Sequence, residues 1–206
     1  MVSMMKQGVK ARLGVAAVGG VLLAGVAGAA FAEEQVGSGE VDVNVQIEDT
    51  GAGVLAMSVA GTSTSLSESG SSELVREFTG ALPTVTVTDT RTAEEIPDGA
   101  FWWVEGTASS FVGDAGQAEI TPDHLGWRPH VADDGSGAVA VGSDVDTVLD
   151  EGPNNVGLQG RELLAMALTS EEAVGSWEAT AELVLKVPAE TAPGAYTSTL
   201  TLSLFE

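Results

Sequence analysis

The sequence predicts an all-β protein, a single antiparallel β-sandwich that follows an N-terminal signal peptide. Three observations lead to this prediction. Apolar and polar residues alternate in several segments, turn-forming residues separate these segments, and none of the 206 residues is a cysteine. The protein must therefore build its core without disulfides, and the chain beyond residue 32 is long enough for one sizeable core. We expect residues 33–206 to form one domain.

The clearest alternation occupies residues 41–47, where Val or Ile stands at every odd position and a polar residue at every even one. The same period of two returns in residues 177–187 and 196–204. Such a pattern predicts strands with one buried and one solvated face. Residues 188–194, which lie between the segments 177–187 and 196–204, are rich in Pro and Gly and predict a loop that joins two antiparallel strands.

The remaining strands are predicted from composition and from the turn signals around them. They are residues 54–59, 74–79, 84–88, 101–107, 126–131 and 138–141. Residues 63–72 contain six serines and are expected to form an exposed loop or hairpin tip. Residues 161–169 favour a helix by propensity, but packing against a sheet can override propensity, so helix and strand both stay open there.

The first 32 residues have the organisation of a secretory signal. Residues 1–12 carry three basic side chains, residues 13–31 carry no charge, and Ala30-Phe31-Ala32 precedes two glutamates. We expect cleavage after Ala32, so that the mature protein is secreted and keeps no permanent membrane span. The alternative is a permanent anchor, because 19 uncharged residues can cross a bilayer.

The expected mature protein is strongly acidic. All 30 acidic residues follow Ala32 and three of the eight basic residues precede it, which leaves 30 acids, five bases and a net charge of −25. A surface with this charge repels nucleic acid and anionic lipid. We therefore expect no nucleic-acid partner.

Motifs that carry catalytic chemistry are missing from the sequence. There is no Gly-x-Ser-x-Gly, the two histidines, His124 and His130, stand in no metal-binding spacing, and no glycine loop for phosphate precedes a helix. Paired acids such as Glu94-Glu95 and Glu171-Glu172 point to opposite faces when they lie on a strand. We expect no catalytic residue and no cofactor.

Clustered acids between residues 133 and 151 are the strongest candidate for a metal site. Asp144, Asp146 and Asp150 are the candidate calcium ligands, together with Asp133, Asp134 and Glu151. Their spacing does not match an EF-hand loop. A solvated acidic loop is the alternative, and it is the one that we expect.

Five segments carry a resemblance to a known family. They are Leu82-Pro-Thr-Val-Thr-Val-Thr-Asp-Thr-Arg91, Phe101-Trp-Trp-Val-Glu-Gly106, Ile120-Thr-Pro-Asp-His-Leu-Gly-Trp-Arg-Pro129, residues 175–189 and residues 194–204. In this order they resemble the WxL-type (WxL domain-like) surface proteins of Gram-positive bacteria, in the form of small secreted actinobacterial proteins. The resemblance implies an exported β-rich protein that associates non-covalently with the cell wall, with peptidoglycan as the ligand.

Two Trp-x-Leu motifs mark the family, and the resemblance places the first on Trp102-Trp103-Val104. The second follows a tyrosine, here Tyr196, but Leu202 stands where the second tryptophan is expected. The resemblance thus makes Trp102, Trp103, Val104 and Tyr196 the wall-binding candidates. Because alternate residues of a strand share a face, we expect Trp102 and Val104 to point one way and Phe101 and Trp103 the other.

The sequence therefore predicts a secreted, non-catalytic cell-envelope protein, located outside the cell or on the wall. Its partner is expected to be peptidoglycan, another wall polymer or another envelope protein. One alternative is a pilin-like or surface-layer subunit that polymerises by strand exchange through the mature terminus or the last strand. The other is a secreted wall-glycan hydrolase.

Cleavage of the signal is directly testable. The secreted protein is expected to begin at Glu33, because the basic, apolar and small-residue regions of a signal are all present. Intact-mass measurement of the protein from the culture medium decides this. A species in the membrane fraction that still carries residues 1–32 would show an anchored protein instead.

Overall fold

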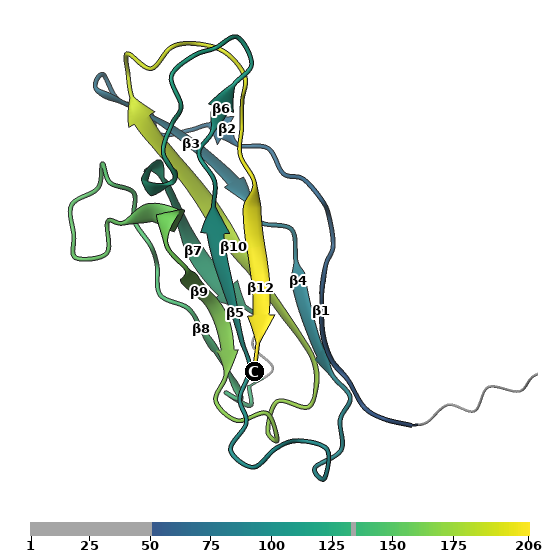
Figure 1. The fold of residues 1–206 in the computed structure, drawn as a ribbon. Coiled ribbons are helices and arrows are strands. Elements are labelled where there is room, and N and C mark those ends of the chain that lie inside the picture. The colour runs from purple at the N-terminus through teal and green to yellow at the C-terminus, as the bar shows by residue number, and fades with distance from the viewer. Residues whose placement is uncertain (1–50, 133–134) are drawn as a thin grey trace, which may run out of the picture. The chain divides into compact units, whose positions relative to one another are not determined.

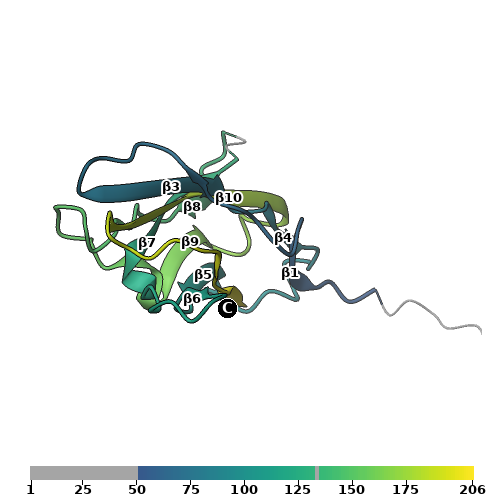
Figure 2. The same cartoon turned by 90° about the horizontal axis from the view of Figure 1, so that it is seen from above.

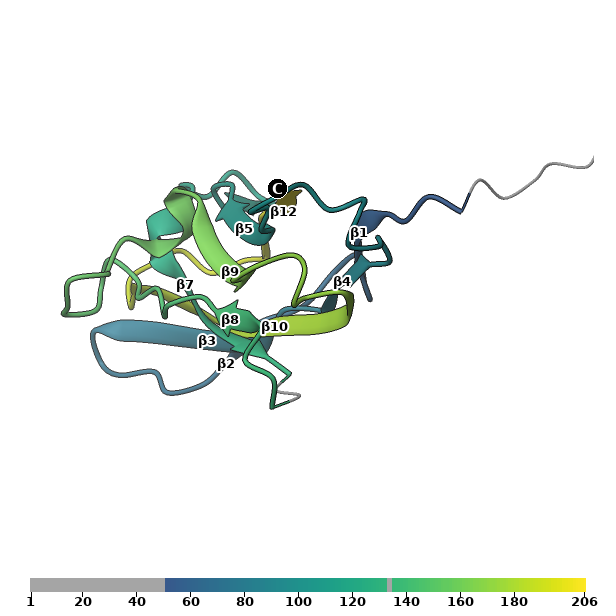
Figure 3. The ribbon, with the colours of Figure 1, turned by 90° about the horizontal axis from the view of Figure 1, so that it is seen from below.

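A computed structural model describes residues 51–132 and 135–206 of the chain. The predicted signal peptide, the predicted strand at 41–47 and the candidate ligands Asp133 and Asp134 lie outside the described residues. The predicted fold class is confirmed: the chain is an all-β protein of antiparallel sheets, which form two layers (Figures 1, 2 and 3).

The larger sheet is organised around the 14-residue strand β10 (Gly175–Pro188). Along one edge of β10 lie β4 (Val85–Asp89), paired with Gly175–Ala179, and β3 (Val75–Ala81), paired with Glu182–Pro188. On the opposite edge, β7 (Leu125–Val131) pairs with Ala179–Leu185. The short strands β1 (Leu55–Val59) and β2 (Ser67–Glu68) extend the sheet beside β4 and β3. One long strand thus aligns three others.

A three-residue break lets β3 and β4 share one edge of β10. Between them, the Leu82 N–H donates to the Ala181 carbonyl at 2.8 Å, and the Thr180 hydroxyl donates to the Leu82 carbonyl at 2.6 Å. Pro83 follows, and proline has no N–H to continue a ladder. The chain therefore steps from one strand to the next without leaving the sheet.

The second sheet has the order β12-β5-β9-β8. It consists of β12 (Leu200–Phe205), β5 (Trp103–Ala108), β9 (Glu162–Ala167) and β8 (Val139–Val141). A separate pair joins β6 (Val112–Gly113) to β11 (Tyr196–Thr197). Two 3-10 turns, η1 (Pro122–His124) and η2 (Gly157–Gln159), are the helical elements of the described residues, and neither approaches the length of a membrane-crossing helix.

Two expectations about individual elements are now decided. Residues 161–169 contain a strand, β9, because Leu164, Ala165 and Ala167 are all buried there against the core. The prediction that residues 177–187 and 196–204 form neighbouring antiparallel strands is wrong. β10 pairs with β3, β4 and β7, whereas β12 pairs with β5, so the Pro- and Gly-rich loop crosses from one sheet to the other.

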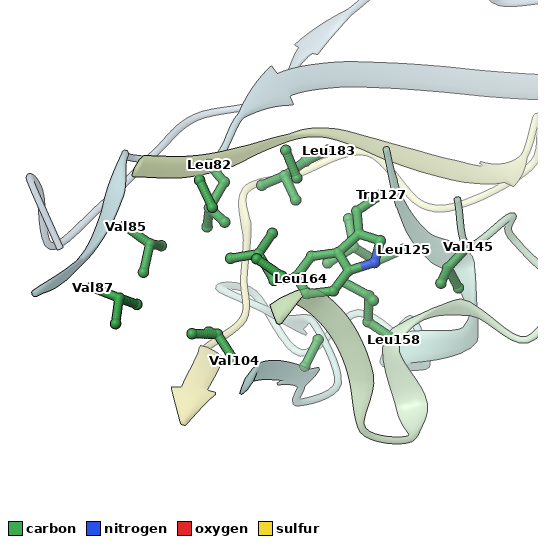
Figure 4. Close-up of a cluster of buried hydrophobic side chains, with 14 of the residues drawn as sticks. Leu82, Val85, Val87, Val104, Leu125, Trp127, Val145, Leu158, Leu164 and Leu183 are labelled. Carbon is green, nitrogen blue, oxygen red and sulfur yellow. The ribbon is translucent and has the colours of Figure 1, made fainter. Parts of the chain in front are cut away.

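The core lies between the sheets and contains two fully buried tryptophans, Trp102 and Trp127. Figure 4 shows Trp127 among aliphatic side chains from both layers, including Leu125, Leu164 and Leu183. Gly106 of β5 lies under this ring, since a Cβ atom at position 106 would stand 2.6 Å from Trp127 Cη2. The absence of a side chain at Gly106 is thus what allows the ring of β7 to lie on the backbone of β5.

Replacing Gly106 by alanine is therefore expected to destabilise the protein by about 1–3 kcal/mol, the usual cost of overpacking a core. Gly160→Ala is the matched control, because a Cβ at Gly160 meets only the Glu162 carboxylate, at 3.6 Å. The control should change the free energy of unfolding by no more than about 0.5 kcal/mol. Urea unfolding followed by tryptophan fluorescence measures both, and equal effects would contradict the contact.

Candidate functional site

The segment that leads into strand β5, residues 101–104, divides its aromatic side chains between the core and the surface. Trp102 and Val104 are 1% and 0% exposed, whereas Phe101 is 42% exposed and Trp103 is half-buried. The predicted division of these four residues between two faces is confirmed. Of the wall-binding candidates in this segment, only Trp103 presents its side chain at the outer surface of the sheet.

The outer surface carries a stack of three aromatic rings, Phe101, Trp103 and Phe205, which we call the aromatic ridge. The ring centroids of Phe101 and Trp103 are 5.4 Å apart with their planes at 29°. Those of Trp103 and Phe205 are also 5.4 Å apart, with an angle of 21°. Register explains the contact across strands, because Phe205 of β12 lies directly opposite Trp103 of β5.

Charged groups lie directly beside the ridge. The Trp103 Nε1–H donates to Glu105 Oε1 at 3.0 Å, which fixes the orientation of the indole. The Arg161 guanidinium lies 5.5 Å from the centre of the Phe205 ring, and its Nη1 atom is 3.9 Å from Glu105 Oε2. A shallow hollow of about 20 Å³ lies beside the rings, and its lining includes Glu105, Arg161, Thr201, Ser203 and Phe205. Apolar rings and polar groups thus meet on one open face.

An ion-pair network holds the end of β12 where the ridge is formed. Glu206 follows Phe205, and both of its carboxylate oxygens accept hydrogen bonds from Arg91, at 2.9 and 2.7 Å. Arg91 also donates from Nε and Nη2 to the two carboxylate oxygens of Asp89, which is 1% exposed. The residue that follows β12 of the second sheet is thereby tied to the end of β4 in the first.

The network shifts the pKa of each member towards its charged form. Hydrogen bonds from Arg91 hold the pKa of Glu206 below its ordinary value. Burial raises the pKa of Asp89, but the hydrogen bonds from Arg91 outweigh burial and leave it lowered. The two carboxylates in turn raise the pKa of Arg91.

The structure does not bring Tyr196 to the ridge. Tyr196 belongs to β11, pairs with Gly113 of β6 and donates its hydroxyl to the Ala192 carbonyl at 2.8 Å. Figure 1 shows β6 at one end of the molecule and the end of β12, to which Phe205 belongs, at the other. Leu202 lies opposite Gly106 and packs against the core. A side chain at position 202 therefore faces the core and not the outer surface of the sheet. The ring beside Trp103 on the outer face is Phe205.

Two of the candidate calcium ligands, Asp146 and Asp150, lie close to basic groups of the protein. Asp150 forms an ion pair with Lys186 and accepts hydrogen bonds from the Thr147 N–H at 3.0 Å and the Thr147 hydroxyl at 2.7 Å. Asp146 lies 3.9 Å from Arg128, and Asp144 is exposed. In the part of the chain that the structure describes, no three His, Asp or Glu residues gather in a way that would hold a metal ion.

Thr121, Asp123 and His124 lie within hydrogen-bonding distance of one another around η1. His124 Nδ1 is 3.0 Å from Asp123 Oδ1 and 3.3 Å from the Thr121 hydroxyl. A hydrolase triad places the acid and the nucleophile on different ring nitrogens. Here both partners meet the same nitrogen within four consecutive residues, an arrangement that stabilises the turn.

A larger pocket, of about 240 Å³, opens between β7 and β8. Among the described residues its lining is mostly apolar and includes Val131, Val139 and Trp177. Asp133 and Asp134, which follow Ala132 of this lining, lie outside the described residues.

Comparisons of the chain with family models, with curated proteins and with solved structures found no match. The geometry of the ridge and the resemblance of the sequence segments are therefore the observations that bear on function.

Sequence reasoning identifies one residue of the ridge as a site and misses the rest. The alternation places Phe101 on the correct face but does not mark it as part of a site, and no motif singles out Glu105 or Arg161. Phe205 belongs to the ridge because β12 pairs with β5. Alternation along a strand does not specify which strand lies beside it, so the sequence pattern cannot predict this pairing. Strand register is the missing information.

The Arg91 network predicts a pH-dependent contribution of Glu206 to stability. Its folded-state pKa is lowered from the ordinary value of 4.5, so this contribution is present above pH 4.5 and is lost as the pH falls through the folded-state value. Glu206→Gln is therefore expected to lower the free energy of unfolding by about 1 kcal/mol at neutral pH, and the difference from the parent should vanish in acid. Glu119→Gln, an exposed site with the same change in charge, is the control. A difference that persists unchanged at acid pH would contradict the role of the carboxylate.

Proposed function

We propose that this chain is a secreted, non-catalytic cell-envelope protein that associates non-covalently with the cell wall, and that the aromatic ridge contacts the glycan strands of peptidoglycan. The observation that carries the proposal is the ridge itself. The sequence holds four Trp, five Phe and one Tyr, and three of these rings stack on one open sheet face. Exposed aromatic groups of this kind mark interaction surfaces.

The chemistry of the ridge suits a saccharide. A pyranose ring has an apolar face of C–H groups, which packs on aromatic carbon, and a rim of hydroxyls, which needs hydrogen-bonding partners. Glu105, Arg161 and the hydroxyls of Thr201 and Ser203 lie directly beside the rings and supply donors and acceptors. Both halves of a sugar ring thus have partners on this face.

The charge of the protein restricts the polymer. The whole chain carries a formal net charge of −22, and removal of the signal would take it to −25, because three basic residues and no acidic residue lie within residues 1–32. Anionic wall polymers are repelled by such a surface. We therefore assign the contact to the uncharged sugar rings of the wall and not to phosphate-rich polymers.

The resemblance to WxL-type surface proteins supports the same assignment. The segment that resembles the first motif, Trp102-Trp103-Val104, contains the central ring of the ridge as its middle residue, Trp103, which stacks between Phe101 and Phe205. The tryptophan at the first position of the motif, Trp102, is buried. A location outside the cell, in a Gram-positive and actinobacterial setting, belongs to the proposal through that resemblance and through the signal at residues 1–32.

Replacing Trp103 by alanine should strongly reduce the amount of protein that pellets with purified peptidoglycan, because the central ring of the ridge is lost. The melting temperature should stay within a few degrees of that of the parent. Val112→Ala, which removes an apolar group 53% exposed elsewhere on the surface, is the control and should pellet like the parent.

Trp102→Ala is expected to act on stability: it should lower the melting temperature strongly or prevent folding. The side chain is 1% exposed, and truncation of a buried tryptophan costs about 3–5 kcal/mol. A parent protein that does not pellet with wall material stripped of anionic polymers, or a Trp103→Ala variant that pellets as well as the parent, would contradict the proposal.

A further inference from the structure

Strand β12 ends its sheet with an edge that no described residue pairs with. The Ser109 N–H donates to the Thr199 carbonyl, so Thr199 and the alternate residues Thr201, Ser203 and Phe205 direct their backbone groups towards β5. The N–H and C=O groups of Leu200, Leu202 and Leu204 must therefore point the other way, along the free edge. Six backbone hydrogen-bonding groups are arranged there as a template for another strand.

The edge has none of the features that protect edge strands from pairing. Natural edges carry charges, prolines or bulges, or are very short. The sequence of β12 is Leu-Thr-Leu-Ser-Leu-Phe, and its register with β5 is regular over all six residues. Three other strands that end the sheets are shorter, with five residues in β1, three in β8 and two in β2. The seven-residue β7, which ends the larger sheet beside β10, carries Arg128 and Pro129 and forms a bridge from Trp127 to Val145. In a chain with 30 acidic residues, an uncharged edge of this length stands out.

The inward side of this edge is incompletely covered. Leu200, Leu202 and Leu204 all contact the core, yet each stays half-exposed. A strand added beside them would complete the backbone ladder, and apolar residues at its alternate positions would cover these leucines. The occupant must therefore be an extended segment with aliphatic residues at every second position.

We propose that the free edge of β12 accepts residues 41–47 of a second copy of this chain as an added antiparallel strand. This inference goes beyond wall binding and does not depend on it. The segment lies outside the described residues, and its sequence supplies what the edge requires: four aliphatic residues at odd positions, polar residues at even positions, and a length of seven residues against six in β12. A donor in one copy and an acceptor in the next give a head-to-tail contact that can propagate.

Reach favours a second copy over the same chain. β1 begins at the end of the sandwich where β12 finishes, because Leu55 pairs with Asp89 and Arg91 joins Asp89 to Glu206. An antiparallel strand from the same chain would finish at the Leu200 end, and the link from Ile47 to Leu55 would have to return over the roughly 20 Å length of β12. That link spans at most about 29 Å when fully extended, and it would also have to cross to the other sheet. A second copy has no such constraint.

Charge repulsion favours residues 41–47 as the occupant of the edge over direct pairing of β12 with β12 of a second copy. Direct pairing of the edges would bring two bodies of formal charge −22 side by side. A single donated strand makes the same backbone hydrogen bonds and places only one narrow segment at the contact. The even-numbered residues of the segment would then face solvent next to Thr201 and Ser203.

Two lysine substitutions in the secreted protein test the donor segment. Val45→Lys places a charge on the aliphatic side, and Asn44→Lys places the same charge on the polar side of the same segment. Size-exclusion chromatography with light scattering should show a parent whose average mass rises with concentration, an Asn44→Lys variant that behaves like the parent, and a Val45→Lys variant that stays monomeric. A parent that is monomeric at all concentrations, or two variants that assemble equally, would overturn the proposal.

Cysteine cross-linking tests the acceptor edge, and the chain has no cysteine to interfere. Opposed residues of neighbouring strands are close enough for a disulfide, so isotope-labelled Asn44→Cys protein mixed with Ser203→Cys protein should yield linked heterodimers. Asp42→Cys and Gln46→Cys cover the neighbouring registers. Ser58→Cys, an exposed residue on the edge strand β1, is the matched control and should yield several-fold less.

Any pattern of cross-links other than preferential linkage of the 41–47 segment of one copy to Ser203→Cys of another overturns the proposal. Preferential linkage to Ser58→Cys would assign the acceptor to β1. Linkage of Ser203→Cys only to itself would indicate pairing of two β12 edges. A doubly substituted Asn44→Cys/Ser203→Cys protein that links only within one chain would show that the segment closes its own sheet. Thermal melts of the single variants establish that each is folded, since Ser203 is not a member of the hydrophobic core and residue 44 is polar.

Discussion

The backbone ladder of β10 is the constraint on which the arrangement of the other elements depends. Its 14 residues pair with β4 and then β3 along one edge and with β7 along the other. Side chains of β10 alternate accordingly, and Ala179, Ala181, Leu183, Leu185 and Val187 are buried. Shifting this register by one residue would move these side chains to the solvated face and displace three neighbouring strands at once.

The position of the ridge follows from that ladder through the core. β10 aligns β7, and β7 carries Trp127, whose ring lies on the backbone of β5 at Gly106. Contact at Gly106 fixes which side of β5 faces the core. The alternation of the strand extends to the residue before it, so Trp102 points inwards and Trp103 outwards. A surface feature that includes residue 103 is thus set by backbone pairing in the opposite layer.

Alternation, composition and turn signals together are sufficient to predict most strands, and alternation predicts the faces of residues 101–104, because burial on one side of a sheet is a local property of the sequence. They are not sufficient to predict which strands are neighbours. The error about residues 177–187 and 196–204 arises because a Pro- and Gly-rich loop can close a hairpin or cross between sheets. Arg91 and Glu206 are 115 positions apart, and no local signal connects them. Residues 161–169 contain a strand because burial of Leu164, Ala165 and Ala167 outweighs helix propensity.

The two proposed surfaces use different atoms of the same strand. The ridge uses the outward ring of Phe205, whereas the free edge uses the backbone groups of Leu200, Leu202 and Leu204. Addition of a strand at the edge therefore leaves the ring accessible, and an assembly of copies would present one ridge per copy. Linked sites can raise overall affinity by about 10² to 10⁴ when the geometry allows simultaneous contact. A weak saccharide contact at a single ridge would then be compatible with firm attachment to a repeating wall polymer, because assembly multiplies the contacts without changing any one of them.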